Sequence, residues 1–417
     1  MERLTHPGAG LPVAVASGST SQPPSLKSPV ETTQGNFRYV RGPSAGSVQI
    51  LDPETELELE RHADLWFKDG SVICQAERTL FRVHISQLSR HSALFRTIFT
   101  LPQPSRPRSL SSFDSLEDTQ VILDECENCP VVFLHDTAED VANFLAALYD
   151  GPNFGDNGRA DFGVVSGVLR LSTKYIVDAL AQKALAHLSI AWPSTLKGWD
   201  AREDLARSFE LETSTSGGHF YPSPIAVINL AREVNAPSLL PAAFYDLCRY
   251  SYAQIYEPAE DEPLYQPTPA PSLSTLDMQR LALGKEAAQH NITSLIQTMG
   301  HAQTHIRAQT HAHIRKNSSG GICVSAAACR KDFSELVDLA TQHYLFDRER
   351  GHCDPLYVSE ELGQLKSAEF SECKACARSL ELWAARERER MFKMIPIWFR
   401  LDFLAPAEQE PGSPRAL

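Results

Sequence analysis

Residues 61–100 read RHADLWFKDGSVICQAERTLFRVHISQLSRHSALFRTIFT, and the hydrophobic period changes twice within this stretch. Leu65-Trp66-Phe67 is a short apolar run, and the Asp69-Gly70 pair that follows it favours a tight hairpin turn into a second strand at residues 72–74. Residues 79–83 are β-branched and aromatic, which predicts a third strand. Beyond them the apolar spacing lengthens to that of a helix.

Two short helices are expected after the third strand. Ile85 and Leu88 share one face of the first helix. Ser92 is a natural N-cap for the second, on which Phe95 and Phe99 share a face. Strands and helices in this order predict a compact α+β head.

Several positions of this head fall in the register of a known family signature. They are Asp64, Phe81-x-Val83-His84, Leu88 and Ser92-x-x-Phe95-x-x-x-Phe99. The pattern resembles the signature of a BTB/POZ domain, and the Trp66-Phe67-x-Asp69-Gly70 hairpin is similar to the large fungal, mushroom-type BTB families. The alternative is a chance hairpin packed on two helices, in which the same apolar residues would still form a core. The resemblance implies short β-strands flanked by a helical cluster, and we expect this domain to span residues 58–192.

The second half of the expected domain carries its own boundary signals. Residues 121–123 and 131–134 are strand candidates. A motif similar to a capping box at residues 137–140 begins a helix with an apolar stripe, and Gly151 can end that helix in a left-handed conformation. Two more helices are expected, over residues 162–171 and 173–191. The strand followed by a capped helix also resembles the BTB order of elements.

Composition divides the rest of the chain. We predict disorder for residues 1–57, because their first 46 positions are rich in Gly, Pro, Ser and Thr without an apolar period. After the head we predict a helical extension at 193–256, a Pro-rich acidic linker at 257–271, a mostly α-helical C-terminal region with a cysteine cluster at 272–404, and a disordered tail at 405–417.

Charge and hydropathy exclude some classes of function. The net charge of -13 argues against a general surface for nucleic acid or anionic membranes, since phosphate contacts need clustered Lys and Arg. No apolar run approaches the roughly eighteen residues of a membrane span, and no secretory signal pattern is present. We therefore expect the chain in the cytoplasm or nucleus, with its nine cysteines reduced.

Sequence motifs of the common catalytic sites are missing. Phosphate-binding glycine loops, the Gly-x-Ser-x-Gly nucleophile motif and the His-Glu-x-x-His zinc motif do not occur. His84 is the most tempting single residue, but in the family resemblance it is structural. We expect no enzymatic activity.

Five of the nine cysteines gather near the C-terminus: Cys323, Cys329, Cys353, Cys373 and Cys376. The Cys373-x-x-Cys376 spacing lets two thiolates grip one Zn²⁺, and the other pair, Cys323 and Cys329, would complete a tetrahedral site. Cys353 or His352 could substitute for one of these ligands. Buried or surface free thiols and a redox Cys-x-x-Cys are the alternatives. Structural zinc is the cofactor hypothesis.

The resemblance also implies partners. BTB domains commonly form homodimers and recruit either the cullin scaffold of ubiquitin ligases or transcriptional co-repressors. The residues we assign to such contacts are Asp64, Ile85, Leu88, Phe95, Phe144 and Leu148. Ile85 departs from the family pattern, because many members carry a basic residue there that faces the acidic residue at the position of Asp64. The alternative function is a zinc-stabilised regulatory protein whose C-terminal cysteine module binds a ligand or nucleic acid.

Overall fold

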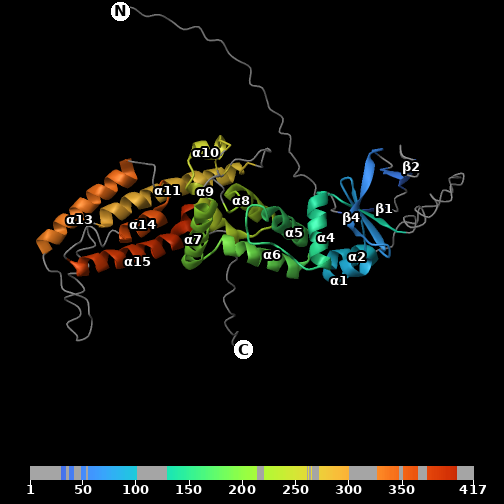
Figure 1. Cartoon of the computed structure of the whole chain (residues 1–417), viewed down its shortest axis with the longest axis horizontal. Coiled ribbons are helices and arrows are strands. Elements are labelled where there is room, and N and C mark those ends of the chain that lie inside the picture. Colours follow the sequence, from blue (N-terminus) through green and yellow to red (C-terminus); the bar gives the residue numbers. More distant parts are fainter. Residues whose placement is uncertain are drawn as a thin grey trace, which may run out of the picture. The chain divides into compact units, whose positions relative to one another are not determined.

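The computed structural model has a mixed α+β fold, and it describes a defined part of the chain (Figure 1). The described residues are 30–33, 37–41, 48–52, 55–100, 129–213, 220–260, 262, 264, 272–299, 326–346, 351–364 and 373–401. The chain divides into two compact units. The first comprises Met1–Val83 and Gln103–Asp136, and the second comprises His84–Pro102 and Thr137–Leu417.

The first unit is built on a β-sheet with the strand order β1-β7-β5-β6-β4-β3-β2. Its strands are β1 (Val30–Thr33), β2 (Arg38–Arg41), β3 (Val48–Leu51), β4 (Glu58–Trp66), β5 (Val72–Ala76), β6 (Thr79–Val83) and β7 (Val131–Leu134). β5 and β6 form an antiparallel hairpin, and β7 runs parallel to β5. The side chains of β5 are buried along its whole length, as expected for a central strand.

The predicted hairpin through Asp69-Gly70 is wrong. β4 does not pair with β5; it pairs in parallel with β6, which lies between them. The hairpin turn lies instead at Glu77, which adopts a left-handed φ of 49° between β5 and β6. Gly70 is needed for a different reason: a Cβ there would lie 2.8 Å from Cγ of Arg82 and 3.0 Å from its backbone, so the chain passes β6 too closely for a side chain.

The prediction of disorder for residues 1–57 is also wrong in part. β1, β2 and β3 lie within this range. β1 pairs antiparallel with β7, and β3 pairs antiparallel with β4. Phe37 and Ile50 are buried in a core cluster together with Leu59, Ile73, Leu80 and Val131. β1 pairs with a strand far along the chain, while β2 and β3 pair with the strand that follows each of them, and composition reveals neither pairing.

The second unit begins with the helices that follow the strand β6. They are α1 (Ile85–His91), α2 (Ala93–Thr100), α4 (Ala138–Tyr149), α5 (Phe162–Lys174) and α6 (Asp178–Ala191). Ser92 caps α2 as predicted: its Oγ accepts a hydrogen bond from the N–H of Phe95 at 3.0 Å and donates one to the carbonyl oxygen of Tyr175 at 2.5 Å. Thr137 caps α4, and Gly151 takes a positive φ of 90° just after that helix.

The remainder of the second unit is helical. Its elements are α7 (Leu196–Thr213), α8 (Pro224–Glu233), the 3₁₀ turn η1 (Pro237–Leu239), α9 (Leu240–Cys248), α10 (Tyr252–Tyr256), α11 (Thr275–Met299), α13 (Ala326–Thr341), the π-helical turn η2 (Gln342–Phe346), α14 (Pro355–Gln364) and α15 (Lys374–Trp398). α11 and α15 pack against α9, so helices from both predicted ranges, 193–256 and 272–404, share a core. None of the helices in the described part combines the length and apolar character needed to cross a membrane.

Candidate functional site

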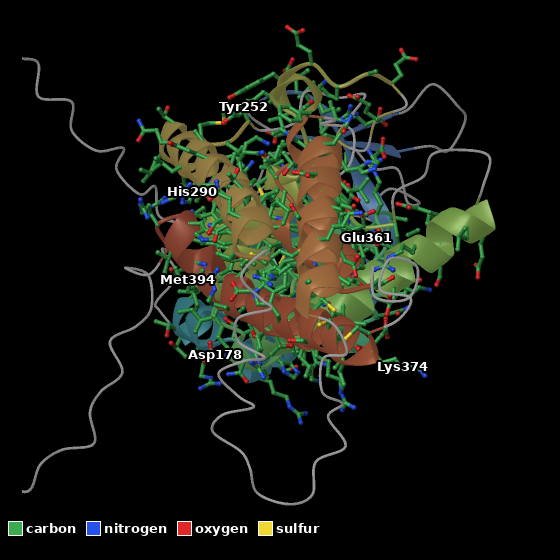
Figure 2. All side chains as sticks on the ribbon, turned by 90° about the vertical axis from the view of Figure 1, so that its left-hand side faces the viewer. Asp178, Tyr252, His290, Glu361, Lys374 and Met394 are labelled. Atoms are coloured by element: carbon green, nitrogen blue, oxygen red, sulfur yellow. The ribbon has the colours of Figure 1, made fainter. Side chains whose placement is uncertain are left out.

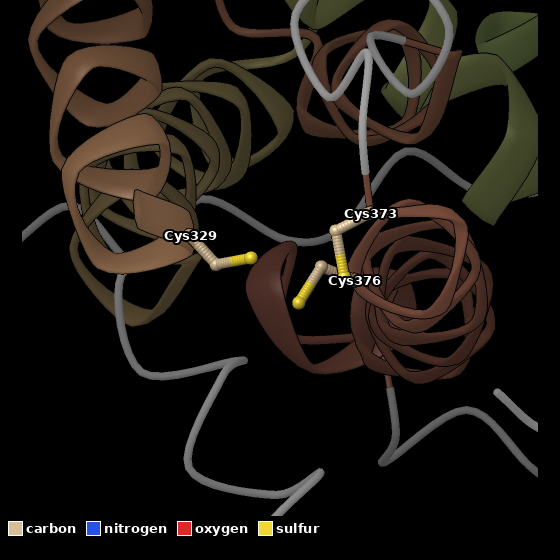
Figure 3. Close-up of side chains that lie close together, drawn as sticks. All are labelled: Cys329, Cys373 and Cys376. Atoms are coloured by element: carbon tan, nitrogen blue, oxygen red, sulfur yellow. The ribbon is translucent and has the colours of Figure 1, made fainter. Parts of the chain in front are cut away.

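Three cysteine side chains converge in the helical C-terminal region. Cys329 belongs to α13, while Cys373 and Cys376 lie at the start of α15. Their Sγ atoms all lie within 4.8 Å of one another (Figure 3). The three residues are buried, with exposed fractions of 2%, 5% and 0%. Residues from two separate helices therefore form one thiol site, which we call the thiol cluster.

The local sequence explains how α15 contributes two of these thiols. Cys373 is the N-cap, and its carbonyl accepts the first helical hydrogen bonds, from the N–H groups of Cys376 at 3.1 Å and Ala377 at 3.2 Å. A spacing of three places both side chains on the same side of the first turn. Lys374 marks this helix start in Figure 2. The positive end of a helix dipole favours the thiolate form, which is the form that binds metals.

The third thiol is oriented by the buried face of α13. The buried side chains of this helix are Cys329, Phe333, Leu336 and Ala340, which recur at the spacing of a helical stripe. The stripe faces the interior, where α13 packs against α11. Cys329 therefore points inward because it continues an apolar face.

The thiol cluster can hold a metal ion. A tetrahedral zinc site has sulfur ligands about 2.3 Å from the metal, which places the sulfurs about 3.8 Å from one another. The three Sγ atoms lie within 4.8 Å of one another, which is close enough for all three to bind one ion. Thiolates select soft ions over Mg²⁺ or Ca²⁺.

Two other predicted ligands are described, Cys353 and His352, and neither belongs to this cluster. Cys323 lies outside the described residues. The Sγ of Cys353 lies 3.8 Å from the carbonyl oxygen of Lys285 and 3.6 Å from Nε2 of His352, and it is not among the clustered thiols. Three of the proposed ligands are thus brought together, and Cys353 belongs to a different environment.

Two cysteines elsewhere in the described residues, Cys74 and Cys248, have the properties of core side chains. Burial raises the pKa of Cys74 to about 12. Burial also raises the pKa of Cys248 well above its ordinary value, and the Sγ of this residue donates a hydrogen bond to the carbonyl oxygen of Cys353 at 3.3 Å. Thiols held in the protonated form are poor nucleophiles and poor metal ligands.

The predicted interaction residues differ in their exposure. Leu88, Phe95, Phe144 and Leu148 are buried, so their side chains pack the helices of the second unit. Asp64 is exposed on β4, and Ile85 is half-buried at the start of α1. Because Asp64 reaches solvent, its carboxylate does not need a basic partner, such as the one that the family resemblance implies at position 85.

His84 has a structural setting. Its backbone N–H donates to the hydroxyl of Tyr149 at 2.9 Å, and its Nδ1 lies 2.9 Å from the same oxygen. These contacts tie the start of α1 to the end of α4. They agree with the structural role that the sequence resemblance implies for this histidine.

Sequence reasoning missed a buried network of charges between α7 and α9. Arg202, with a side chain 3% exposed, contacts Glu203 and Asp246 at 2.6 Å each. Arg249 contacts the same two carboxylates and also lies 3.5 Å from Asp354. Burial alone would raise the pKa of Asp246, but the two arginines outweigh it and lower that pKa. The two arginines thus favour the ionised form of Asp246 in the interior.

Aromatic rings enclose this network. The guanidinium of Arg202 lies 4.4 Å from the ring centre of Tyr221 and 4.8 Å from those of Trp192 and Trp199. An open cavity of about 840 Å³ borders the network, and its lining carries arginines and carboxylates together. Charges of both signs are already paired here, so the arrangement serves to join helices. No short motif could have revealed it, since Arg202 and Asp246 lie on different helices far apart in the chain.

Comparisons with known proteins give no match: no family model, no curated protein and no solved structure matches this chain. A functional proposal therefore rests on the chain's own residues and their geometry.

Proposed function

We propose that this protein is a non-catalytic protein-interaction module, which forms a homodimer and recruits partners through a domain of the BTB/POZ type. The supporting observation is the order and pairing of its elements. The β5–β6 hairpin is followed by α1 and α2, then by β7, which runs parallel to β5, and then by α4, α5 and α6. The motif resemblance implies the same order of elements along the chain, although the hairpin that it implies between β4 and β5 is not formed.

The surface of α1 and α2 supports the choice of a second copy as the first partner. Ile85 on α1 and Leu94, Ile98 and Phe99 on α2 are half-buried apolar residues. Beneath them, the buried Leu88 and Phe95 fix the two helices. Partly exposed apolar side chains on adjoining helices provide area that a symmetric dimer can bury.

Two kinds of further partner fit this proposal. One is the cullin scaffold of a ubiquitin ligase, with the chain as an adaptor, and the other is a transcription-linked co-repressor. Ile85 weighs against the second, because the charged pocket of the family's dimer groove needs a basic residue there. Both kinds of partner fit a cytoplasmic or nuclear protein.

The oligomeric state of the full chain tests the dimer. Size-exclusion chromatography with light scattering at micromolar concentration should give the mass of a dimer. Ile85→Asp should give a monomer, because it places a charge in the proposed interface, whereas Ser86→Asp, at an exposed position of the same helix, should stay dimeric. Circular dichroism checks that both variants fold. A monomeric parent protein would contradict the proposal.

A binding measurement separates the two kinds of partner. Isothermal titration calorimetry of the full chain with a purified cullin scaffold should show saturable binding if the chain is an adaptor. Absence of binding removes the adaptor and leaves the transcription-linked scaffold.

The convergence of three thiols favours a second proposal, that the protein is zinc-stabilised. We propose a structural zinc ion held by Cys329, Cys373 and Cys376, with Cys323 as the fourth ligand. The protein would then be a regulatory protein whose C-terminal cysteine module binds a ligand or nucleic acid. Four thiolates from distant positions would stabilise a helical region that has no disulfide among its described cysteines.

Metal analysis of the purified full chain tests the zinc proposal. Mass spectrometry should find one zinc ion per chain. Cys376→Ser should lose the zinc, while Cys129→Ser, at a half-buried cysteine of the first unit, should keep it. The proposal would be contradicted if the parent protein were purified without zinc and did not bind zinc under reducing conditions.

A further inference from the structure

We infer that metal binding at the thiol cluster controls the docking of helix α13, because the ion joins the beginning of α13 to the beginning of α15. This inference rests on the proposed zinc site and assigns it a consequence. The cluster brings side chains of α13 and α15 together (Figure 3).

The packing of α13 differs from that of the helices beside it. α14 and α15 pack against each other, and both pack against α11. α13 packs against α11. Apart from Cys329, its buried side chains are Phe333, Leu336 and Ala340. Leu339 is 43% exposed on the same helix, and Phe346 is 79% exposed in the turn η2 that follows it. A helix held by one narrow apolar stripe is more sensitive to an added or removed link than a helix enclosed on several sides.

The metal link would close a long segment of chain. The segment between Cys329 and Cys373 contains η2 and α14. A cross-link across such a segment restricts the conformations open to the undocked chain, and this effect grows with the length of the loop that is closed. Without a metal, the three cysteine side chains contribute ordinary packing and weak hydrogen bonds. The ion replaces this weak contact with coordinate bonds to both helices.

A metal–thiolate group at this site would be negatively charged. A divalent ion with three thiolates carries one negative charge, and with four thiolates it carries two. The sequence places charges of both signs next to the cysteines: Arg330 follows Cys329 and Lys374 follows Cys373, while Glu372 precedes Cys373. The ions expected to bind are thiophilic and divalent, with Zn²⁺ as the biological one and Cd²⁺ as its substitute in experiments.

Hydrogen–deuterium exchange on the full chain, read by mass spectrometry, tests the inference under reducing conditions. The protein is compared after removal of metal by a chelator and after reloading with Zn²⁺. In the zinc-loaded protein, the amide exchange rate of peptides from α13 should fall by at least about tenfold, because docking protects their amides. Peptides from α5, far from the cluster in sequence, should exchange at the same rate in both forms.

A matched pair of variants locates the effect. Cys329→Ser should leave α13 exchanging at the metal-free rate after addition of Zn²⁺, whereas Ala328→Ser, at the exposed neighbouring position, should behave as the parent does. Zinc binding with unchanged exchange in α13 would overturn the inference and leave the zinc site standing. Failure to bind zinc would overturn both.

Discussion

Residues 58–192 and the helices after residue 193 are stabilised in different ways. In the first range, local signals begin and end the elements: Ser92 and Thr137 cap helices, and Gly151 follows one with a positive φ. In the second range, polar and sulfur-containing side chains meet from distant positions, as Arg202 meets Asp246 and Cys329 meets Cys373. Motifs can therefore identify the first range, while the second becomes intelligible only when its long-range contacts are known.

The difference has an energetic side. Loss of a cap removes about 1 kcal/mol, since water can replace the lost hydrogen bond at a helix end. Loss of one partner from a buried charge network leaves another charge uncompensated away from water, which costs several times more. Single substitutions should therefore have larger effects in the helices after residue 193.

The largest effect is expected for Arg202→Ala. The substitution removes the guanidinium that contacts Glu203 and Asp246, and it empties the space between Trp192 and Trp199. We expect the free energy of unfolding to fall by about 3–5 kcal/mol, measured by urea denaturation followed by circular dichroism.

Arg207→Ala is the matched control for this change. Arg207 lies on the same helix, and its side chain is 58% exposed beside Asp204. Its loss should change the unfolding free energy by about 0.5 kcal/mol or less. Equal effects of the two substitutions would show that the buried network is no more important than a surface ion pair.

The next largest effect is expected where α11 approaches Phe399. A Cβ at Gly284 would lie 1.9 Å from the ring of Phe399, which is fully buried and stacks on Phe244. Gly284→Ala should lower the unfolding free energy by about 1–3 kcal/mol, because a packed ring has little room to move.

Gly163→Ala makes the same chemical change at an open position. The nearest atom to its added Cβ is 3.9 Å away, so no clash arises. Here the stability should change by less than about 1 kcal/mol, and in the favourable direction, since Ala is the better helix former. A stabilising Gly284→Ala would mean that α11 and Phe399 are not closely packed in solution.

Local pattern predicted several elements well. The strand at residues 79–83 and the apolar stripe of the helix that begins at residues 137–140 were predicted from spacing. The stripe consists of Val141, Phe144, Leu145 and Leu148, and all four are buried. The pairing of β4 was not predictable in this way, because an Asp-Gly turn is equally compatible with a crossing to a non-adjacent strand. Likewise β1 depends on a ladder partner, β7, that a local window does not contain. β2 and β3 do have nearby partners, but the Gly, Pro, Ser and Thr content around them hides the strand pattern.

The candidate sites show the same division. The Cys373-x-x-Cys376 spacing was visible in the sequence, and Cys329 was named as a partner. Only the packing of α13 shows that the Cys329 thiol lies beside the other two. Cys353 was a further candidate by spacing, yet it lies beside Lys285 and His352. Ligands from separate helices are selected by tertiary packing, which residue spacing does not contain.

A smaller effect is expected for Ser92→Ala in the motif-defined range. The hydroxyl makes two hydrogen bonds, from the N–H of Phe95 and to the carbonyl oxygen of Tyr175. Its removal should lower the unfolding free energy by about 1–2 kcal/mol. Thr100→Ala is the control, because the exposed Thr100 hydroxyl bonds only within its own helix among the contacts described, and denaturation should show almost no change. An equal loss in both variants would argue against a capping role.

The smallest effect is a change in the acid dependence of stability at Asp277. Burial alone would raise the pKa of this carboxyl group, but hydrogen bonds from Arg232, Ser274 and Arg280 outweigh burial and lower it. The folded protein therefore holds fewer protons than the unfolded chain near the ordinary Asp pKa of about 3.9. The stabilisation from this group is present above that pH and is lost as the pH falls toward the lower folded pKa.

Asp277→Asn removes this titration while keeping the shape of the side chain. Urea denaturation at a series of pH values from neutral to acid should show a shallower loss of stability below about pH 4 than in the parent. Asp204→Asn, at a side chain 73% exposed, should leave the slope unchanged. If stability changed equally little with pH in both variants, the ion pairs of Asp277 would contribute no more to the free energy of unfolding than a solvated carboxylate does. The contrast between the two ranges of the chain would then rest on the Arg202 network alone.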